Sequence, residues 1–157
     1  MDEHDYDRFM RSVARRAYVR LAALPLIGLR GFREAEIREL ELRLGRPLPA
    51  AYRAFLRKMG RSAGSLFGDV TLTFDGIGPL VDLQATARDA AQEAGSLDAI
   101  PPGAFFFDSY LDTQFGFFVS HEDDDPMTFN FEGGNPSLDP PVPCGRFTEV
   151  IRSFVEG

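Results

Sequence analysis

Residues 37–60, IRELELRLGRPLPAAYRAFLRKMG, decide which class of fold this chain adopts. The first half of the stretch predicts a short helix, because three apolar residues fall on one helical face: Ile37, Leu40 and Leu44. Gly45 stands where a left-handed residue commonly ends a helix, and Pro47 prevents the helix from continuing. The stretch therefore predicts a helix that ends in a tight corner at Gly45.

A second short helix is predicted directly after this corner. Pro49 suits the first position of a helix, where the missing N–H is not needed. Four apolar residues then form a stripe that is expected to be buried: Tyr52, Phe55, Leu56 and Met59. Gly60 is expected to end this helix. Two short amphipathic helices cannot bury their apolar faces alone, so the rest of the chain is expected to supply a sheet.

From Asp69 onward, apolar residues recur with a period of two, which is typical of strands. This alternation predicts a strand at residues 69–75, and residues 80–83 are interpreted as a further short strand. Three more strands with short connections are predicted at residues 104–110, 115–120 and 127–132. Such short connections favour an antiparallel meander.

Helical spacing of apolar residues predicts three further helices, at residues 5–24, 84–94 and 147–155. Residues 133–145 are rich in Pro and Gly and are predicted to form a loop. With 157 residues, 44% of them hydrophobic, the chain can bury one core, so a single domain over residues 1–157 is expected. The predicted fold class is α+β, with N-terminal helices and a C-terminal helix packed on a twisted, mainly antiparallel sheet of about four to six strands.

The predicted strands carry aromatic residues on both faces. Strict alternation within residues 104–110 places two residues on one face and three on the other: Phe105 and Phe107 opposite Phe106, Asp108 and Tyr110. Phe118 is likewise assigned to the face opposite the main aromatic stripe. This second face could be covered by loops, or it could form the aromatic centre of an interface rimmed by Asp108 and Glu132.

No run of about eighteen apolar residues occurs, so no membrane span is expected. The N-terminal sequence MDEHDYDRF is acidic and does not resemble a secretory signal peptide. Cys144 is the single cysteine, which excludes an internal disulfide and is consistent with a reducing compartment. We therefore expect a soluble, cytoplasmic protein.

The two parts of the chain differ in charge. Residues 1–61 contain fourteen Lys or Arg and eight acids, whereas residues 62–157 contain three Arg and sixteen acids, for a net charge of −7. An acidic surface repels nucleic-acid phosphates and speeds encounters with basic proteins. Acids also keep a Phe-rich domain soluble, but solubility alone does not require the two signs to segregate.

Five arginines lie on one face of the helix predicted at residues 5–24: Arg8, Arg11, Arg15, Arg16 and Arg20. Such a stripe could contact phosphates or an anionic membrane surface. We interpret it as a solvated face, because acids lie nearby and no aromatic residues alternate with the arginines for bases to stack on. Neither a nucleic-acid partner nor a membrane partner is expected.

The sequence contains no clear catalytic or metal-binding constellation. His121 has serine and acidic neighbours, but adjacent side chains diverge and cannot form a nucleophile–base relay, so a hydrolase would need a distant second group. The run from Asp123 to Asp125 lacks the alternating acids and central Gly of a calcium loop. Cys144 lies in a predicted loop, and no His or Cys pair has metal-ligand spacing. Neither an enzyme nor a cofactor is expected.

The corner stretch also carries a family resemblance, in this order of residues: Ile37, Glu41, Leu44-Gly45, Leu48-Pro49, Tyr52, Phe55-Leu56, Gly60. The order resembles the opening signature of the SUKH superfamily, the domain of the yeast cell-wall-synthesis regulator Smi1. The resemblance covers roughly residues 28–155 and departs from the family at residues 111–114, where members often have a Gly-Gly-Asp-like turn. It implies an α+β domain that binds another protein and has no shared catalytic residues. Many bacterial members are immunity proteins, each of which neutralises a toxin delivered between cells.

We therefore expect a non-enzymatic protein-binding module, an immunity protein that neutralises a basic toxin domain, for example a nuclease, by masking its active site. The immunity role and the toxin class are implied by the resemblance, while the acidic surface follows from the sequence. Eight residues are predicted to contact the partner: Asp108, Asp112, Phe118, Glu122, Asp123, Asp124, Asp125 and Glu132. The alternative is a regulatory or scaffold module of the same fold that binds a host protein.

Overall fold

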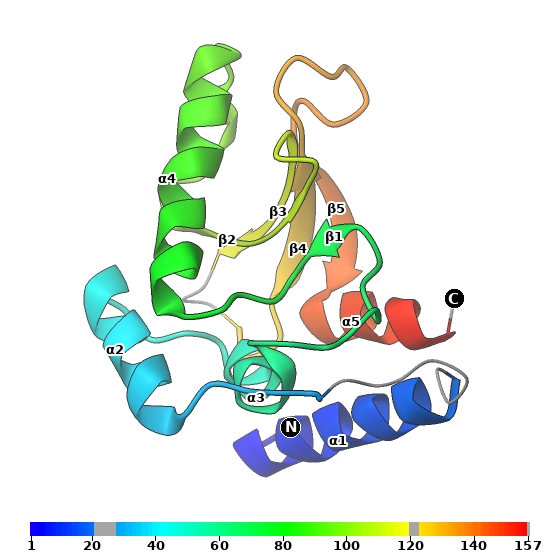
Figure 1. Cartoon of the computed structure of the whole chain (residues 1–157). Helices are drawn as coiled ribbons and strands as arrows, with labels where there is room; N and C mark the ends of the chain where they lie inside the picture. Colours follow the sequence, from blue (N-terminus) through cyan, green and yellow to red (C-terminus); the bar gives the residue numbers. More distant parts are fainter. Residues whose placement is uncertain (21–27, 120–122, 157) are drawn as a thin grey trace.

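The computed structural model describes residues 1–20, 28–119 and 123–156. Its helices are α1 (Glu3–Arg20), α2 (Glu34–Leu44), α3 (Ala50–Met59), α4 (Ile77–Glu93), the short 3-10 helix η1 (Leu97–Ala99) and α5 (Phe147–Glu156). Its strands are β1 (Val70–Thr71), β2 (Ala104–Tyr110), β3 (Gln114–Val119), β4 (Met127–Phe131) and β5 (Val142–Arg146). The strands form one antiparallel sheet in the order β1-β2-β3-β4-β5, which confirms the predicted α+β fold. Figure 1 shows the helices arranged around the strands.

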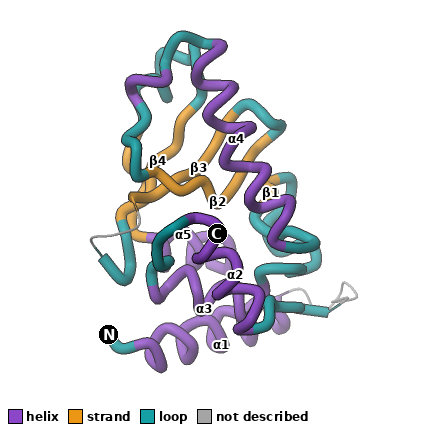
Figure 2. Tube along the Cα trace, turned by 90° about the vertical axis from the view of Figure 1, so that its left-hand side faces the viewer, coloured by secondary structure: helices purple, strands orange, loops and turns teal. Residues whose placement is uncertain are grey.

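Helices cover the sheet from two sides. Tyr52 of α3 contacts the rings of Phe105 and Phe118, with ring centres 5.3 and 5.4 Å away, so α3 packs on the face that carries these two residues. Phe147 of α5 lies on the same face, 5.4 Å from Phe107. α4 runs beside β2, and Figure 2 shows it standing above the group formed by α1, α2 and α3. The sheet is therefore enclosed by helices at its base and along one side.

α1 completes the core from below. Its Tyr6, Met10 and Val13 are buried in the same hydrophobic cluster as α3 and α5. The helix predicted at residues 5–24 is confirmed as far as Arg20, and its last residues lie outside the described part of the chain. Among the described residues, no helix has the length and apolar character needed to cross a membrane.

The corner between α2 and α3 has the predicted form, with one small shift. Gly45 is left-handed, with φ at 70°, and ends α2. The side chain of Glu41 reaches across the corner and accepts the N–H of Leu48 at 2.8 Å. Pro49 is the N-cap of α3, so the helix begins just after the predicted position, and Gly60 ends it as predicted. The corner thus fixes the directions of two short helices relative to each other.

The strand predicted at residues 69–75 is shorter than expected, because only Val70–Thr71 pair with β2. The alternation still identified buried side chains, since Leu72 and Phe74 belong to the core. The N–H of Phe74, however, donates to the carbonyl of Gly60 at 2.9 Å and not to a neighbouring strand. Alternating burial therefore occurs here without extended pairing.

Two further predictions are wrong. Residues 80–83 were expected to form a strand, but they lie inside α4, where four buried residues repeat at helical spacing: Leu80, Leu83, Ala87 and Ala91. Residues 133–145 were expected to form a loop, but their last part is β5. The strand was not predicted because Pro141 and Pro143 are typical of loops. β5 lies at the edge of the sheet, where a proline without an N–H is tolerated.

A bulge in β2 changes which side chains share a face. The pairing with β3 shifts between Phe106 and Asp108, so Phe107 is an extra residue in β2. As a result, Phe107 and Asp108 both line a cavity on the α5 side of the sheet. The strict alternation predicted for this strand therefore fails at Asp108.

Phe118 is also on a different face from the one predicted. It pairs with Phe105 across β2 and β3, and both rings contact Tyr52 of α3. The side chain is 0% exposed, so the prediction that Phe118 offers an aromatic surface to a partner is wrong. Phe106, on the other face, is equally buried and lies beneath the guanidinium of Arg88 from α4. The second face was predicted either to be covered by loops or to form an aromatic interface. The structure shows that it is covered, but by the helix α4 and not by loops.

Candidate functional site

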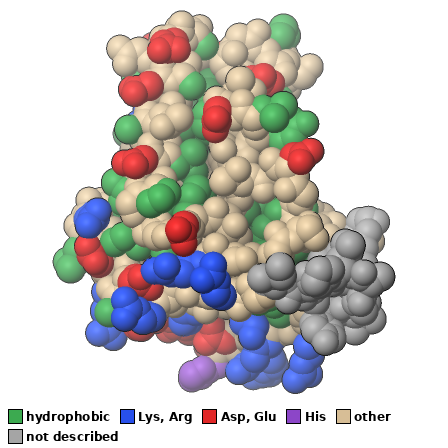
Figure 3. Space-filling model, in the orientation of Figure 1, with side chains coloured by type: hydrophobic (Ala, Val, Ile, Leu, Met, Phe, Trp, Pro, Cys, Tyr) green, Lys and Arg blue, Asp and Glu red, His purple; other side chains and the backbone are tan. Residues whose placement is uncertain are grey.

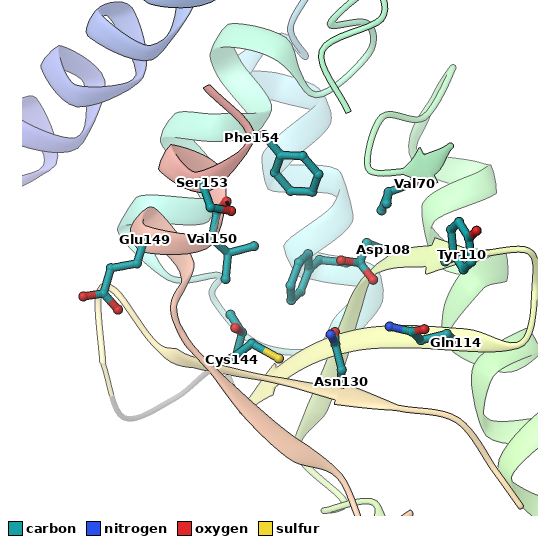
Figure 4. Close-up of a pocket in the computed structure, with 12 residues that line it drawn as sticks. Val70, Asp108, Tyr110, Gln114, Asn130, Cys144, Glu149, Val150, Ser153 and Phe154 are labelled. Atoms are coloured by element: carbon teal, nitrogen blue, oxygen red, sulfur yellow. Dashed lines mark hydrogen bonds between the residues drawn. The ribbon is translucent and has the colours of Figure 1, made fainter. Parts of the chain in front are cut away.

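A cavity of about 490 Å³ opens between the sheet and α5 (Figure 4). All five strands and α5 contribute to its lining: Val70, Phe107, Asp108, Tyr110, Gln114, Thr128, Asn130, Cys144, Glu149, Val150, Ser153 and Phe154. Polar side chains come mainly from the strands, and apolar ones come mainly from α5 and from the rim at β1. The cavity is thus a place where the helices leave one face of the sheet accessible.

Asp108 is the central charged side chain of this cavity. Its Oδ1 accepts the N–H of Gly116 at 2.6 Å. A Cβ at Gly116 would lie only 2.5 Å from the same oxygen, so the carboxylate occupies the space in which a side chain would stand. Glycine inside a strand often marks such a close approach. The bulge in β2 and the glycine in β3 together hold Asp108 in place.

The environment of Asp108 disfavours its charge. Burial raises the pKa of the Asp108 carboxyl to about 7, although the hydrogen bond from the Gly116 N–H acts in the opposite direction. Among the described residues that line the cavity, none is Lys, Arg or His. Asp108 therefore lacks a cationic neighbour in the lining and changes its charge close to neutral pH, a property common at functional sites.

Hydrogen bonds to the backbone hold two further side chains of the lining, Thr128 and Glu149. The hydroxyl of Thr128 donates to a carbonyl of β5 at 2.8 Å, and Glu149 accepts the N–H of Arg146 at 2.8 Å, at the start of α5. Figure 4 shows Glu149 at the rim, turned away from Asp108. Burial raises the pKa of the Cys144 thiol, so the reactive thiolate is disfavoured.

The lining of the cavity has the chemistry of a binding site. Within the described ranges, no group of three or more metal-ligating side chains comes together. His121, around which a hydrolase was considered, lies outside the described residues. The lining offers a half-buried carboxyl group, two side-chain amides, a phenol and apolar walls. Such a set fits a group that donates hydrogen bonds and carries positive charge.

The acidic turn before β4 has structural partners of its own. Asp125 accepts the N–H of Thr148 at 3.0 Å and its hydroxyl at 2.6 Å, at the start of α5. The carbonyl of Asp124 accepts an N–H at the start of α3 at 2.9 Å. Asp123 pairs with Arg146 at 2.6 Å. The turn therefore ties two helix N-termini to the sheet, where negative charge is favourable.

The predicted partner-binding residues do not form one surface. Asp112 and Glu132 follow the ends of β2 and β4, whereas Asp123 to Asp125 precede β4, at the opposite end of the sheet. Glu122 lies outside the described residues. Of the predicted residues that the structure describes, only Asp108 lines the cavity.

Sequence reasoning missed most of the polar lining: Gln114, Thr128, Asn130, Cys144, Glu149 and Ser153. One signal was present, because Gly116 interrupts a strand of aromatic residues and lies opposite Asp108 in the meander. The bulge and the strand β5, which complete the cavity, leave no comparable mark in the sequence.

Residues 31–143 match the SMI1 / KNR4 family (SUKH-1). The chain belongs to this family. The resemblance inferred from the corner sequence is thereby confirmed, whereas no curated protein was found to match the sequence. In this SUKH-1 protein, the matched segment supplies Asp108, Gln114 and Asn130 to the cavity. Cys144 and the side chains of α5 come from the part of the chain that follows the match.

Proposed function

We propose that this SUKH-1 protein is a non-enzymatic, protein-binding module of the immunity type that acts in the cytoplasm. It neutralises a basic toxin domain, for example a nuclease, by covering the active site of the toxin with an acidic surface. Membership of the family supports a protein partner, because many bacterial SUKH members are immunity proteins. The proposal that this partner is basic rests on the distribution and pairing of charges in this chain.

The observation that carries the proposal is how differently the charges are paired in the basic half (residues 1–61) and the acidic half (residues 62–156). In the basic half, seven acids that the structure describes form ion pairs with arginines of the same half: Glu3, Asp5, Asp7, Glu34, Glu36, Glu39 and Glu41. In the described acidic half, ion pairs involve only Asp123 and Glu156 among the acids. The acidic half therefore directs most of its charge outward.

Figure 3 shows the consequence on one face, where carboxylates are spread over the upper part and Lys and Arg gather below. Six exposed acids lie on α4 and on nearby turns: Asp75, Asp82, Asp89, Glu93, Asp98 and Asp112. Among the described residues, the arginines of this half form no ion pair with these six acids: Arg88 donates to a backbone carbonyl of β2 at 3.0 Å, and Arg146 pairs with Asp123. Arg152 lies over the ring of Phe9 at 5.2 Å, at the base. Such a field attracts a basic protein and speeds the encounter.

Co-expression with a basic toxin domain tests this function, and a toxin gene next to the gene of this protein would be the first candidate. We expect an equimolar complex to co-purify, and the activity of the toxin to disappear once the two proteins are equimolar. A toxin that stays fully active in the presence of excess SUKH-1 protein would contradict the immunity role. Recovery of a host protein in a defined complex, with no effect on any adjacent toxin, would instead support the scaffold alternative.

A further inference from the structure

We propose that the cavity between the sheet and α5 is the docking site for a cationic side chain, arginine or lysine, of the protein partner, with Asp108 as its anchor. The proposal rests on the proposed function in one respect, namely that the partner is a basic protein.

The polar side of the cavity matches a group that carries positive charge and donates several hydrogen bonds. A carboxylate offers about four lone-pair sites, and the Gly116 N–H occupies one of those on Asp108. Gln114 and Asn130 lie beside Asp108 in Figure 4, and each carries an amide oxygen that accepts further N–H groups. Among the described lining residues there is no cation, so the anchoring charge of the site is negative.

The size and the walls of the cavity suit a long side chain. Its volume of about 490 Å³ lies within the range of roughly 300–1,000 Å³ that is usual for ligand sites. Four apolar residues form its walls: Val70, Phe107, Val150 and Phe154. Arginine and lysine pack their methylene stems against such surfaces while the charged end reaches a polar partner.

The hydrogen bond from the Gly116 N–H does not by itself explain why residue 108 is an aspartate. An asparagine would accept the same hydrogen bond from Gly116. It would also avoid the cost of ionising a carboxyl group in a place where burial disfavours the charge. Four titratable groups lie on the elements around it: Tyr110 of β2, Cys144 of β5, Tyr52 of α3, and Glu149 of α5, which is turned away at the rim. All of them are acidic or neutral, so a bound cation would stabilise the ionised Asp108 and release its proton below about pH 7.

A protein side chain fits this cavity better than a small free cation does. The cavity opens in the acidic half, and Tyr110, which lines it, is 39% exposed. The next residue, Leu111, is 69% exposed. A protein surface would cover these apolar side chains, whereas a small cation would leave them in water.

Nuclear magnetic resonance titration of the whole chain with N-acetyl-arginine methylamide tests the proposal, and N-acetyl-citrulline methylamide is the neutral control. We expect the arginine probe to shift the resonances of Asp108, Gln114 and Asn130 with a Kd of about 1–10 mM. The citrulline probe should bind about tenfold more weakly, because it lacks the charge-assisted hydrogen bond. On saturation with the arginine probe, the pKa of Asp108, followed through its carboxyl carbon, should fall.

Two variants sharpen the test. Asp108→Asn should abolish the preference for arginine over citrulline, whereas Asp82→Asn, which removes an exposed carboxylate of α4 outside the cavity, should keep it. A second measurement needs no variant, because occupation of the cavity should slow the alkylation of Cys144 by iodoacetamide.

An equal response to both probes, or shifts that arise away from the cavity, would overturn the proposal. Tighter binding of putrescine than of the arginine probe would assign the cavity to a free small cation and would also overturn it. The two proposals fail separately. A toxin that is neutralised equally by the protein and by Asp108→Asn refutes the docking site alone. A cavity that binds the arginine probe in a protein without effect on the toxin refutes the immunity role alone.

Discussion

The basic and acidic halves treat their charges differently. In the basic half, Arg57 of α3 lies 3.0 Å from the carboxylate of Glu3, 2.9 Å from that of Asp7 and 3.5 Å from that of Glu34. In the acidic half, Asp82 and Asp89 of α4 are exposed and form no ion pair with the described residues. The first arrangement satisfies charge inside the protein, because Arg57 ties α1 and α2 to α3. The second leaves charge for another molecule. An uneven distribution of charge along the sequence therefore has different consequences in the two halves, because charges that form ion pairs contribute little to the field at a distance.

The largest effect is expected where the two halves meet in the core. Phe118 from the acidic half contacts Tyr52 from the basic half, so Phe118→Ala should lower the free energy of unfolding by about 3–5 kcal/mol. Chemical denaturation measures this difference. The control is Leu111→Ala at an exposed position, which should change stability by less than about 0.5 kcal/mol. A small effect at Phe118 would mean that its face of the sheet is open.

Among the described acids of the acidic half, Asp108 is the one whose ionisation the fold disfavours. Because its pKa rises from 3.8 to about 7 on folding, the folded state keeps a proton that the unfolded state loses between these values. Its contribution to stability is therefore complete below about pH 4 and is lost as the pH rises through about 7, by about 2–4 kcal/mol.

Asp108→Asn should remove this pH dependence and be more stable than the parent at pH 8, while the two differ little near pH 4. Urea denaturation at both pH values provides the measurement. A variant that keeps the full pH dependence would show that other groups cause it and that Asp108 is not held in a desolvated site.

The pairing of charges gives a smaller effect and tests the comparison directly. Arg57→Gln breaks three ion pairs of a partly buried network and should lower stability by about 1–2 kcal/mol. Asp89→Asn in the acidic half should change it by less than about 0.5 kcal/mol. Thermal unfolding at low salt measures both. Equal losses would show that the acids of α4 are engaged in stabilising the fold.

The smallest predicted effect concerns the turn between β2 and β3. Leu111 and Asp112 both have positive φ, at 52° and 56°, and the N–H of Thr113 donates to the carbonyl of Tyr110 at 3.2 Å. Leucine is unfavourable in this conformation, whereas asparagine tolerates it, so Leu111→Asn should raise stability by about 0.5–1 kcal/mol. Leu111→Ala retains the strain and serves as the control. If Leu111 also contacts the protein partner, Leu111→Asn should bind that partner more weakly than the parent protein does.

Patterns that arise from local chain geometry were predictable from the sequence. The corner at Gly45, the helices around it and the strands from Ala104 to Phe131 follow from apolar spacing and from turn residues. The prediction of a strand at residues 80–83 was wrong because a short apolar run fits a strand and a helix equally well. The prediction for β5 failed because Pro141, just before the strand, and Pro143, within it, are typical of loops as well as of sheet edges.

The site was less predictable, because it depends on contacts between distant segments. The bulge after Phe106 moves Asp108 to the α5 side, and no propensity of the individual residues marks that shift. Glu149 and Cys144 reach the cavity only because β5 pairs with β4 and leads directly into α5. The Asp123–Asp125 turn was visible as a charged run, but its bonds to helix N-termini could be identified only in three dimensions.

Whether the acidic half guides a basic partner can be measured through the association rate with the toxin domain, for two double charge reversals of equal size. Asp82→Lys with Asp89→Lys alters the acidic half, and Glu34→Lys with Glu39→Lys alters the basic half by the same net charge. We expect the first pair to slow association about tenfold at low salt and the second pair to change it little, with both differences vanishing at high salt. Equal rates for the two variants, or a rate that does not respond to salt, would contradict an acidic half that guides a basic partner.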